Sequence, residues 1–423
     1  MKIAIVPDNH LNKAVYKGVM DRDNPQIPFR NVDFMNGFKF AVDTCIDELK
    51  PDMFVIPGDV YDNHLPSNEV RKFFSAQLSR LTKAKIPVII LVGNHDIYKK
   101  NHGLQDIQEL QLKTIVVLDK PTITAYKDTQ LFLFPCTFDV EQKRKTIKED
   151  FSDFVKEIQA KKDDRLSIFF GHFGVRGASI NQYRGDEEDV EDIDTMTNTT
   201  TTVMKNFKNK DENNISLEDL DSIGADYVFL GDYHQYQTLN TKKCVAMYSG
   251  SIEKTSFSEV GQVKGFILFD SEIESKNKRD KCRFIEYPNC RPMLELKGNF
   301  LDIQAAFRKI DYSKYQDAIV KIRFNGNSSE LVDYSSGLDA LKKEIREKVN
   351  PIHLYSINNT KDDQQEQAAT QLENDITENG HLSNDDVRDV AKEEIRERVK
   401  DEKEMALTLA LAEEIYQEQT AGK

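Results

Sequence analysis

The sequence predicts an α/β protein built around a parallel sheet, because short apolar runs alternate with segments of helical spacing. Two of these runs, residues 53–56 and 87–92, are rich in β-branched residues and are bounded by Pro and Gly. Such runs are typical of buried strands, and helical patterns between them indicate parallel connections. The first run leads into Gly58-Asp59 and the second into Gly93-Asn94-His95-Asp96. Ligands gather at the carboxyl ends of such strands, so both clusters are expected to face one crevice.

The other elements of the first two thirds of the chain follow from the same patterns. Short apolar runs predict further strands at residues 2–6, 115–118, 131–134, 166–170, 225–230, 244–249 and 264–269. Apolar residues spaced by three and four predict helices at residues 33–49, 67–84 and 147–160. The first of these helices is expected to stop before Pro51, because proline disfavours helical geometry at the residue that precedes it.

A different unit is predicted to begin near Arg291-Pro292. Helix and strand alternate there at residues 300–309, 318–324, 337–347 and 352–356. The chain is therefore expected to divide into a main domain (1–290), a small α+β domain (291–360), a polar linker (361–383) and a helical tail (384–423). Short helices are marginal alone, so the tail is expected to dock onto another surface, the alternative being a solvated helix on its own body.

Composition places the protein among ordinary globular chains of two or three domains. The 423 residues are 39% hydrophobic and 31% charged, and no apolar run reaches the ~18 residues that a transmembrane helix needs. The N-terminal apolar stretch is too short for a signal peptide and is better interpreted as the first strand. The five cysteines are scattered, without a CxxC pair, which indicates a reducing cytoplasm and disfavours a disulfide framework or thiolate zinc site.

The net charge of −14 is concentrated at the C-terminal end. Residues 361–423 contain 18 acidic and 8 basic residues, which leaves 54 acidic and 50 basic residues in the rest of the chain. A nearly neutral body that binds divalent cations can still meet a phosphate backbone, because the ions are then the largest local charges. Net charge alone therefore does not exclude a polyanionic partner.

Polar turns that follow apolar strands carry the candidate chemistry. The five turns contain Asp8 and His10; Asp59; Asn94 and His95; His172; and Asp232 and His234. A single Gly-Asp turn or strand-end histidine is ordinary, but five in succession favour a common site. Oxygen and imidazole ligands without cysteine suit Mn²⁺, Fe²⁺ or Zn²⁺, and a carboxylate such as Asp59 can bridge two ions that clamp a phosphoryl group. No serine or cysteine beside a base presents itself as a nucleophile.

These motifs, in this order and spacing, resemble the signature of the calcineurin-like metallophosphoesterases. Within that superfamily the chain resembles the SbcD/Mre-eleven nuclease subunits, most of all the phage version of that recombination endonuclease subunit. Ser249-Gly250-Ser251-Ile252 and the following Thr255-Ser256-Phe257-Ser258-Glu259 resemble the segment after the last metal motif, and Arg291-Pro292 resembles the start of the capping domain. The resemblance implies a four-layer sandwich of two mixed β-sheets flanked by helices, with a DNA-binding capping domain.

The resemblance also implies roles for individual residues. One ion is expected at Asp8, His10, Asp59 and His234, and a second at Asp59, Asn94, His172 and Asp232. His95 matches the catalytic histidine that stabilises or protonates the leaving 3′ oxygen, and Asp96 would orient it. Two divalent ions are implied, Mn²⁺ in the first place and Mg²⁺ as a possibility.

Two positions depart from the family pattern. Asp232 stands where the last motif usually has its first histidine, which adds negative charge at the second ion and favours Mn²⁺ or Mg²⁺. Asp62 stands where some members have a histidine tied to exonuclease activity and others have aspartate. This leaves the direction of cleavage open.

The implied activity is a 3′→5′ double-strand exonuclease and single-strand endonuclease that processes DNA ends in repair, recombination and replication in the cytoplasm. The implied partner is an SMC-like coiled-coil ATPase bound through residues 384–423; the chain has no phosphate-binding loop of its own. A homodimer is implied too. The apolar face of helix 67–84, with Leu104, Ile107 and Leu110, is the candidate contact, unless that face packs on the sheet.

Three points stay open at this stage. The same two-ion centre serves a phosphomonoesterase or a nucleotide phosphodiesterase, although neither needs the 291–360 domain and the acidic tail. A non-catalytic DNA-end scaffold is the alternative from another class, and the intact Asn94-His95-Asp96 argues against it. Residues 176–215, low in apolar content, are interpreted as a lid or DNA-facing loop, or else as a surface insertion.

Overall fold

The computed structural model describes residues 1–360 apart from residues 14, 17–18, 24–25, 138–143, 179–214 and 327. It divides the chain into two compact units, Met1–Arg291 and Pro292–Lys423. The linker predicted at 361–383, the tail predicted at 384–423 and nearly all of the loop predicted at 176–215 lie outside the described residues.

The first unit contains two six-stranded sheets. The first sheet has the order β14 (Cys282–Glu286), β13 (Gly265–Asp270), β1 (Lys2–Ile5), β2 (Met53–Pro57), β3 (Val88–Leu91) and β6 (Ile115–Leu118). The second sheet has the order β11 (Gln237–Leu239), β12 (Val245–Tyr248), β10 (Tyr227–Gly231), β9 (Leu166–His172), β8 (Thr129–Phe134) and β7 (Thr122–Tyr126). Every strand predicted for this unit lies within or overlaps one of these elements.

Both sheets are mixed. In the first sheet β1, β2, β3 and β6 run parallel, whereas β13 and β14 pair antiparallel at one edge. In the second sheet β8, β9, β10 and β12 run parallel, and β7 and β11 close the two edges antiparallel. The parallel centres of both sheets are the part that the apolar runs predicted, and the two mixed sheets are those that the family resemblance implied.

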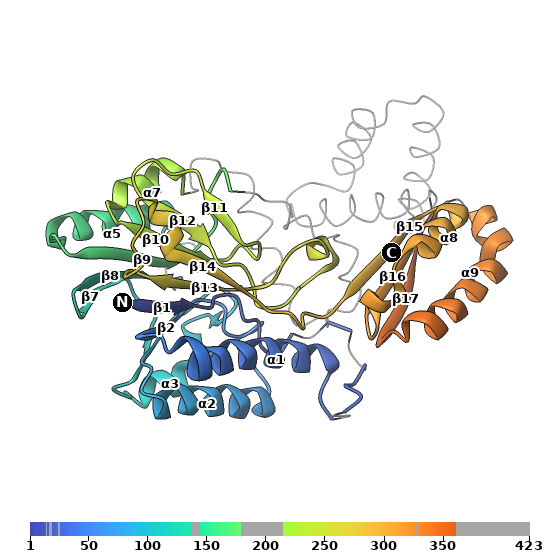
Figure 1. Ribbon diagram of the computed structural model, residues 1–423, viewed down its shortest axis with the longest axis horizontal. Helices are drawn as coiled ribbons and strands as arrows, with labels where there is room; N and C mark the ends of the chain where they lie inside the picture. The colour runs from blue at the N-terminus through green and yellow to red at the C-terminus, as the bar shows by residue number, and fades with distance from the viewer. Residues whose placement is uncertain are drawn as a thin grey trace, which may run out of the picture. The chain divides into compact units, whose positions relative to one another are not determined.

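Alternation along the strands builds four layers. In β2, Phe54 and Ile56 belong to the core that α1 and α2 share, while Met53 and Val55 belong to the core between the two sheets. The second sheet packs its other face against α5 and α7. Figure 1 shows α1, α2 and α3 on one side of the paired sheets and α5 and α7 on the other. The four-layer sandwich is confirmed.

The helices in the described part of this unit are α1 (Phe29–Thr44), α2 (Asn68–Lys83), α3 (Gln105–Glu109), α5 (Ile147–Lys161) and α7 (Leu217–Ile223). Short elements complete it: a π-helical turn at Cys45–Leu49, the hairpin of β4 (Ile97–Tyr98) and β5 (Asn101–His102), and 3₁₀ turns at η4 (Phe257–Glu259) and η5 (Lys278–Lys281). Helix α1 begins four residues before the predicted start. Its first turn contains Arg30 and Asp33, which are buried as an ion pair. Because these residues are polar, the spacing of apolar residues does not indicate that this turn is helical.

The apolar face of α2 packs within its own chain. Val70, Phe74, Leu78 and Leu81 are at most 2% exposed and belong to the core between α1, α2 and the first sheet. Leu104 and Ile107 are buried in the same core, whereas Leu110 is 65% exposed. The helical part of this face therefore packs on the sheet, which was the alternative, and of the residues expected at the dimer contact Leu110 is the exposed one.

The second unit is a small α+β module in its described part. A parallel sheet has the order β15 (Met293–Gly298), β16 (Ile319–Gly326) and β17 (His353–Thr360). The helices α8 (Phe300–Lys309) and α9 (Ser328–Val349) and the turn η6 (Tyr312–Tyr315) connect these strands. Leu294, Val320 and Ile322 pack against Ile303 and Ile345 in one core. Helix α9 starts nine residues before the predicted helix.

Two negative findings apply to this structure. No helix among the described residues combines the length and the apolar character that crossing a membrane requires. All five cysteines, Cys45, Cys136, Cys244, Cys282 and Cys290, are free thiols.

Candidate metal centre

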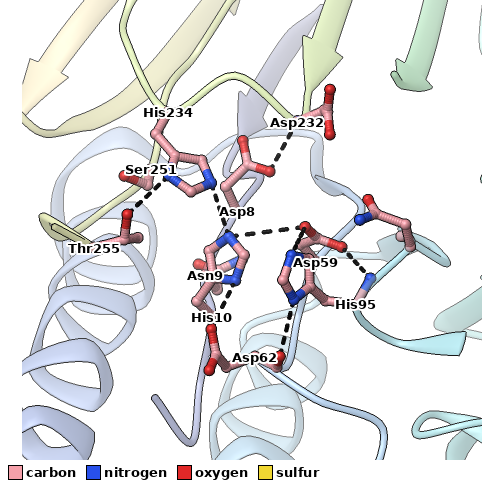
Figure 2. Close-up of polar contacts among 12 residues, drawn as sticks. Asp8, Asn9, His10, Asp59, Asp62, His95, Asp232, His234, Ser251 and Thr255 are labelled. Atoms are coloured by element: carbon pink, nitrogen blue, oxygen red, sulfur yellow. Dashed lines mark hydrogen bonds and ion pairs between the residues drawn. The ribbon is translucent and has the colours of Figure 1, made fainter. Parts of the chain in front are cut away.

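The polar strand-end turns of both sheets meet in one place. Three groups of side chains bring ligand atoms to within 4.8 Å of one another: Asp8 with His10 and His234, His10 with Asp59 and His95, and Asp8 with Asp59 and His172. Figure 2 shows His10, Asp59 and His234 turned toward one another. The parallel centres of both sheets end at this point, so residues far apart in the sequence share one site.

Two glycines let these turns approach closely. A Cβ atom on Gly93 would lie 2.1 Å from Oδ1 of Asp59, and one on Gly58 would lie 2.1 Å from Nδ1 of His172. Gly58 also has φ +91°, which an L side chain rarely adopts. Both turns therefore need glycine for space, and the Gly-Asp turn also needs it for its backbone geometry.

Several predicted ligands have a strained backbone. The φ angles are 51° at Asp8, 40° at His10, 51° at Asp59 and 96° at Asp232. Left-handed geometry costs a non-glycine residue on the order of 1–3 kcal/mol and is concentrated at functional sites. At these four residues the strained backbone directs a polar side chain or a backbone N–H group into the cluster.

Asp8, His10 and His234 form what we name the first ligand group. The Nε2 atoms of His10 and His234 lie 3.0 Å apart, and Oδ2 of Asp8 is buried with no hydrogen-bond partner among the residues that the structure describes. Burial lowers the pKa of His10 to about 4, so this imidazole is neutral and offers a lone pair. Two imidazole nitrogens and a free carboxylate oxygen that converge in a buried space fit a divalent cation.

Asp59, Asn94 and His172 form the second ligand group. Nε2 of His172 lies 2.9 Å from Oδ1 of Asn94 and 3.3 Å from Oδ1 of Asp59. The carbonyl oxygen of Pro57, 2.8 Å from Nδ1 of His172, accepts from that nitrogen and so places a proton there. Burial lowers the pKa of His172, but Asp59 and Asp8 outweigh this and raise the pKa well above its ordinary value, so Nε2 donates toward these oxygens when no ion is bound. A divalent cation in place of that proton would have the lone pair of Nε2 and the two oxygens as ligands, so the donor set fits a second ion.

Asp59 lies between the two groups. Its Oδ1 faces His172, and its Oδ2 lies 3.8 Å from Nε2 of His10 and 4.0 Å from Nε2 of His95. Burial raises the pKa of this carboxyl, but His172 and His95 outweigh it and hold the pKa below its usual range. Asp59 is thus an anion with one oxygen for each group, as a bridging ligand requires.

The other two carboxylates of the cluster differ from Asp59. Burial raises the pKa of Asp8 to about 6, against the opposing charges of His172 and His234. Burial also raises the pKa of Asp232. These directions are expected where anions gather without their cations. The backbone N–H of Asp232 donates to Oδ1 of Asp8 at 2.9 Å, but its carboxylate is in none of the three converging groups. Its role as a ligand stays a prediction.

His95 is partly open to solvent, with 27% of its side chain exposed. Its Nδ1 lies 2.9 Å from the carbonyl oxygen of Asp62, so it donates there and leaves Nε2 directed to the cluster. Burial lowers the pKa of His95, but the carboxylates of Asp59 and Asp62 outweigh this and raise the pKa above its ordinary value.

Asp96 takes a different place from the one expected. Its carboxylate accepts backbone N–H bonds from Gly93 at 3.0 Å, Tyr61 at 3.0 Å and Val60 at 3.3 Å. Among the described residues it makes no hydrogen bond to the His95 ring, which the Asp62 carbonyl orients instead. The expected contact is corrected: Asp96, 0% exposed, ties the turn after β2 to the turn after β3.

The sequence interpretation gave no role to two further residues at this site. Oε1 of Glu259 lies 2.9 Å from Nδ1 of His234, and Nζ of Lys264 lies 2.6 Å from Oε2 of Glu259. Glu259 belongs to the segment after the last polar turn that the family resemblance included, which was the available signal. Nothing in the sequence distinguished Lys264 from the other lysines.

Comparisons with known proteins identify the family of this chain. The family model described as calcineurin-like phosphoesterase matches residues 1–236, more than half of the chain. The protein belongs to the calcineurin-like phosphoesterase family, whose members hydrolyse phosphoesters with divalent metal ions.

Two relatives and one solved structure illustrate the similarity. The SbcD subunit of the nuclease SbcCD from Staphylococcus epidermidis is 25% identical over 316 residues, which cover 72% of this chain and 74% of that protein. The protein of the same name from Staphylococcus saprophyticus is 24% identical over 280 residues, which cover 62% of this chain and 66% of that protein. The crystal structure of TT1561 of Thermus thermophilus aligns with a TM-score of 0.36 at 9% identity, covering 67% of this chain and 98% of that one.

Proposed function

We propose that this protein is a two-metal-dependent DNA nuclease, with 3′→5′ exonuclease activity on double-strand ends and endonuclease activity on single strands. The observation that carries the proposal is that the two ligand groups lie on either side of Asp59, whose two carboxylate oxygens face one group each. The relatives, which are named as the SbcD subunit of a nuclease, support DNA as the substrate, since they match in sequence over most of their length.

The residues divide between binding and proton transfer. Asp8, His10, Asp59 and His234 would hold one ion, and Asp59, Asn94, His172 and Asp232 would hold the other. When bound, Mn²⁺ or Mg²⁺ ions supply Lewis-acid stabilisation of the phosphoryl oxygens and a more acidic water. The buried side chains fix the positions of the ligand atoms, and the strained turns keep them fixed when substrate arrives.

His95 is the proton donor in this proposal. Its Nδ1 donates to the Asp62 carbonyl, its raised pKa favours the imidazolium form, and its partly exposed ring presents Nε2 to a substrate. A proton given from Nε2 to the leaving 3′ oxygen would neutralise the charge that develops as the P–O bond breaks. Asp59 and Asp62 hold the protonated form, and the Asp62 carbonyl fixes the ring.

Two assembly partners belong to the proposal. The names of the relatives describe one component of SbcCD, which supports a partner for this chain, and we propose an SMC-like ATPase that binds through residues 384–423. We also propose a homodimer in the cytoplasm, through a surface other than the buried face of α2. Sedimentation equilibrium of the isolated chain would distinguish a dimer from a monomer.

The test compares wild type with His95→Asn on three substrates: linear duplex DNA, single-stranded DNA and p-nitrophenyl phosphate, each with Mn²⁺. We expect wild type to cleave both DNAs. The variant should lose about 10²–10⁴-fold in rate, the usual contribution of a general acid, and keep Mn²⁺ affinity, because neither of the two proposed ligand sets includes His95.

Two results would contradict the proposal. Turnover of the monoester without DNA cleavage would identify a phosphomonoesterase on the same fold. Inactivity on all three substrates, with or without an ATPase partner, would favour a DNA-end scaffold.

A further inference from the structure

His234 belongs to the first ligand group and follows a strand of the second sheet. A buried ion pair contacts this histidine on the side away from His10. Glu259, in η4, places Oε1 2.9 Å from Nδ1 of His234, and Thr255 places Oγ1 3.1 Å from the same nitrogen. Lys264 forms an ion pair with Glu259 at 2.6 Å and donates to the carbonyl oxygen of His234 at 2.9 Å. Figure 2 shows His234 between Thr255 on one side and His10 on the other.

The contacts of Glu259 determine which nitrogen of His234 donates. Glu259 forms its ion pair with Lys264 at 2.6 Å and accepts from the backbone N–H of Thr255 at 2.9 Å, so it is a carboxylate that only accepts. Nδ1 of His234 therefore donates, and the lone pair lies on Nε2, 3.0 Å from Nε2 of His10. The carboxylate thus selects the tautomer that turns a lone pair toward the proposed ion.

Stability alone does not account for this ion pair. Glu259 and Lys264 are each 1% exposed, so folding removes both charges from water. A buried ion pair is often no more stabilising than apolar residues of similar volume, because desolvation offsets the attraction. A carboxylate behind a metal-binding imidazole, in contrast, orients the ring and raises its basicity.

We propose that Glu259, neutralised and held by Lys264, is a positioning residue for the metal centre: it fixes the tautomer and direction of His234 and so raises the affinity of the first ligand group for its ion. This inference rests on the proposed metal centre. It assigns Glu259 and Lys264 no contact with DNA, so it is testable by metal binding without any cleavage assay.

The matched control is Glu253, a second buried glutamate six residues earlier. It is 0% exposed and accepts from the backbone N–H of Lys254 at 2.8 Å and of Arg291 at 3.0 Å. Neither of these donors is a predicted ligand. Glu253→Gln and Glu259→Gln therefore remove the same charge from the same kind of environment, and only the second change reaches His234.

The experiment is calorimetric titration of the metal-free full-length chain with Mn²⁺ for wild type, Glu259→Gln and Glu253→Gln. Wild type should bind two ions. Glu259→Gln should bind one ion about 10–100-fold more weakly, the usual effect of losing such a carboxylate, and the other ion unchanged. Glu253→Gln should bind both ions as wild type does. Circular dichroism melts in chelator establish that each variant is folded.

Three results would overturn the inference. These are wild-type affinity in Glu259→Gln, equal weakening in Glu253→Gln, or no Mn²⁺ binding by wild type, which would remove the metal centre as well. Loss of DNA cleavage with Mn²⁺ binding intact would count against the proposed nuclease alone. If Glu259→Gln does not fold, Glu259→Asp replaces it: it keeps the charge that pairs with Lys264 but shortens the side chain that reaches His234 Nδ1, and wild-type Mn²⁺ affinity in that variant would also overturn the inference.

Discussion

The two ligand groups are built from similar atoms but are supported in different ways. In the first group, Nδ1 of His234 faces the carboxylate of Glu259, and Nδ1 of His10 lies 3.4 Å from the carboxylate of Asp62. In the second group, Nδ1 of His172 donates to the main-chain carbonyl of Pro57 at 2.8 Å. One group is therefore supported by charged side chains and the other by the backbone at the end of β2.

This difference indicates which of the two ligand groups can be weakened by substituting the residues that support it. A main-chain carbonyl cannot be removed by substitution, and its position is set by the pairing of β2 with β1 and β3. A side-chain carboxylate can be removed, and it also adds charge, which makes the imidazole a stronger ligand. Substituting side chains that support the ligand residues should therefore weaken metal binding by the first group and leave metal binding by the second group unchanged.

The largest expected effect comes from the residue that the two groups share. Asp59→Asn removes the charge from the one side chain whose oxygens face both groups. We expect Mn²⁺ binding to weaken at both positions and DNA cleavage to fall by at least the ~10²–10⁴-fold expected for His95→Asn. Calorimetry with Mn²⁺ measures this directly, and a variant that loses only one ion would contradict a bridging role for Asp59.

The smallest expected effect concerns Asp62. Its carboxylate is 3.4 Å from His10 Nδ1, long for a hydrogen bond, and it also pairs with Lys13 at 2.7 Å. Asp62→Asn should therefore weaken the first ion less than Glu259→Gln does, by about 10-fold or less, the lower end of the range for such residues. The same Mn²⁺ titration measures it. A larger loss than in Glu259→Gln would reverse the order of support that the distances indicate.

Much of the centre could be predicted from the sequence because its ligands follow strands. Asp8, Asp59 and His172 each come directly after an apolar run, and parallel strands bring their carboxyl ends together. The apolar runs did not indicate that there are two sheets. A strand that is buried on both faces is apolar at every position, as Met53–Ile56 are, so its sequence does not show what each face packs against. The prediction of a second sheet came from the resemblance to the family, and the structure confirmed it.

The support behind the ligands could not be predicted. Asp96 follows His95 directly, and adjacency in sequence suggested a contact, but the strand-end turn directs the two side chains to different partners. Lys264 is 30 residues from His234 and reaches it only because the segment before β13 lies beside the turn after β10. Contacts of this kind depend on tertiary packing, which no local pattern in one sequence records.

The central claim is that the strand-end turns form a centre for two ions. The most direct measurement is anomalous diffraction at the manganese edge from crystals of the full-length chain grown with Mn²⁺. We predict two peaks, one beside Nε2 of His10 and His234 and one beside Nε2 of His172, with Asp59 between them. No peak at these residues, or a single peak in contact with both ligand groups, would contradict the account.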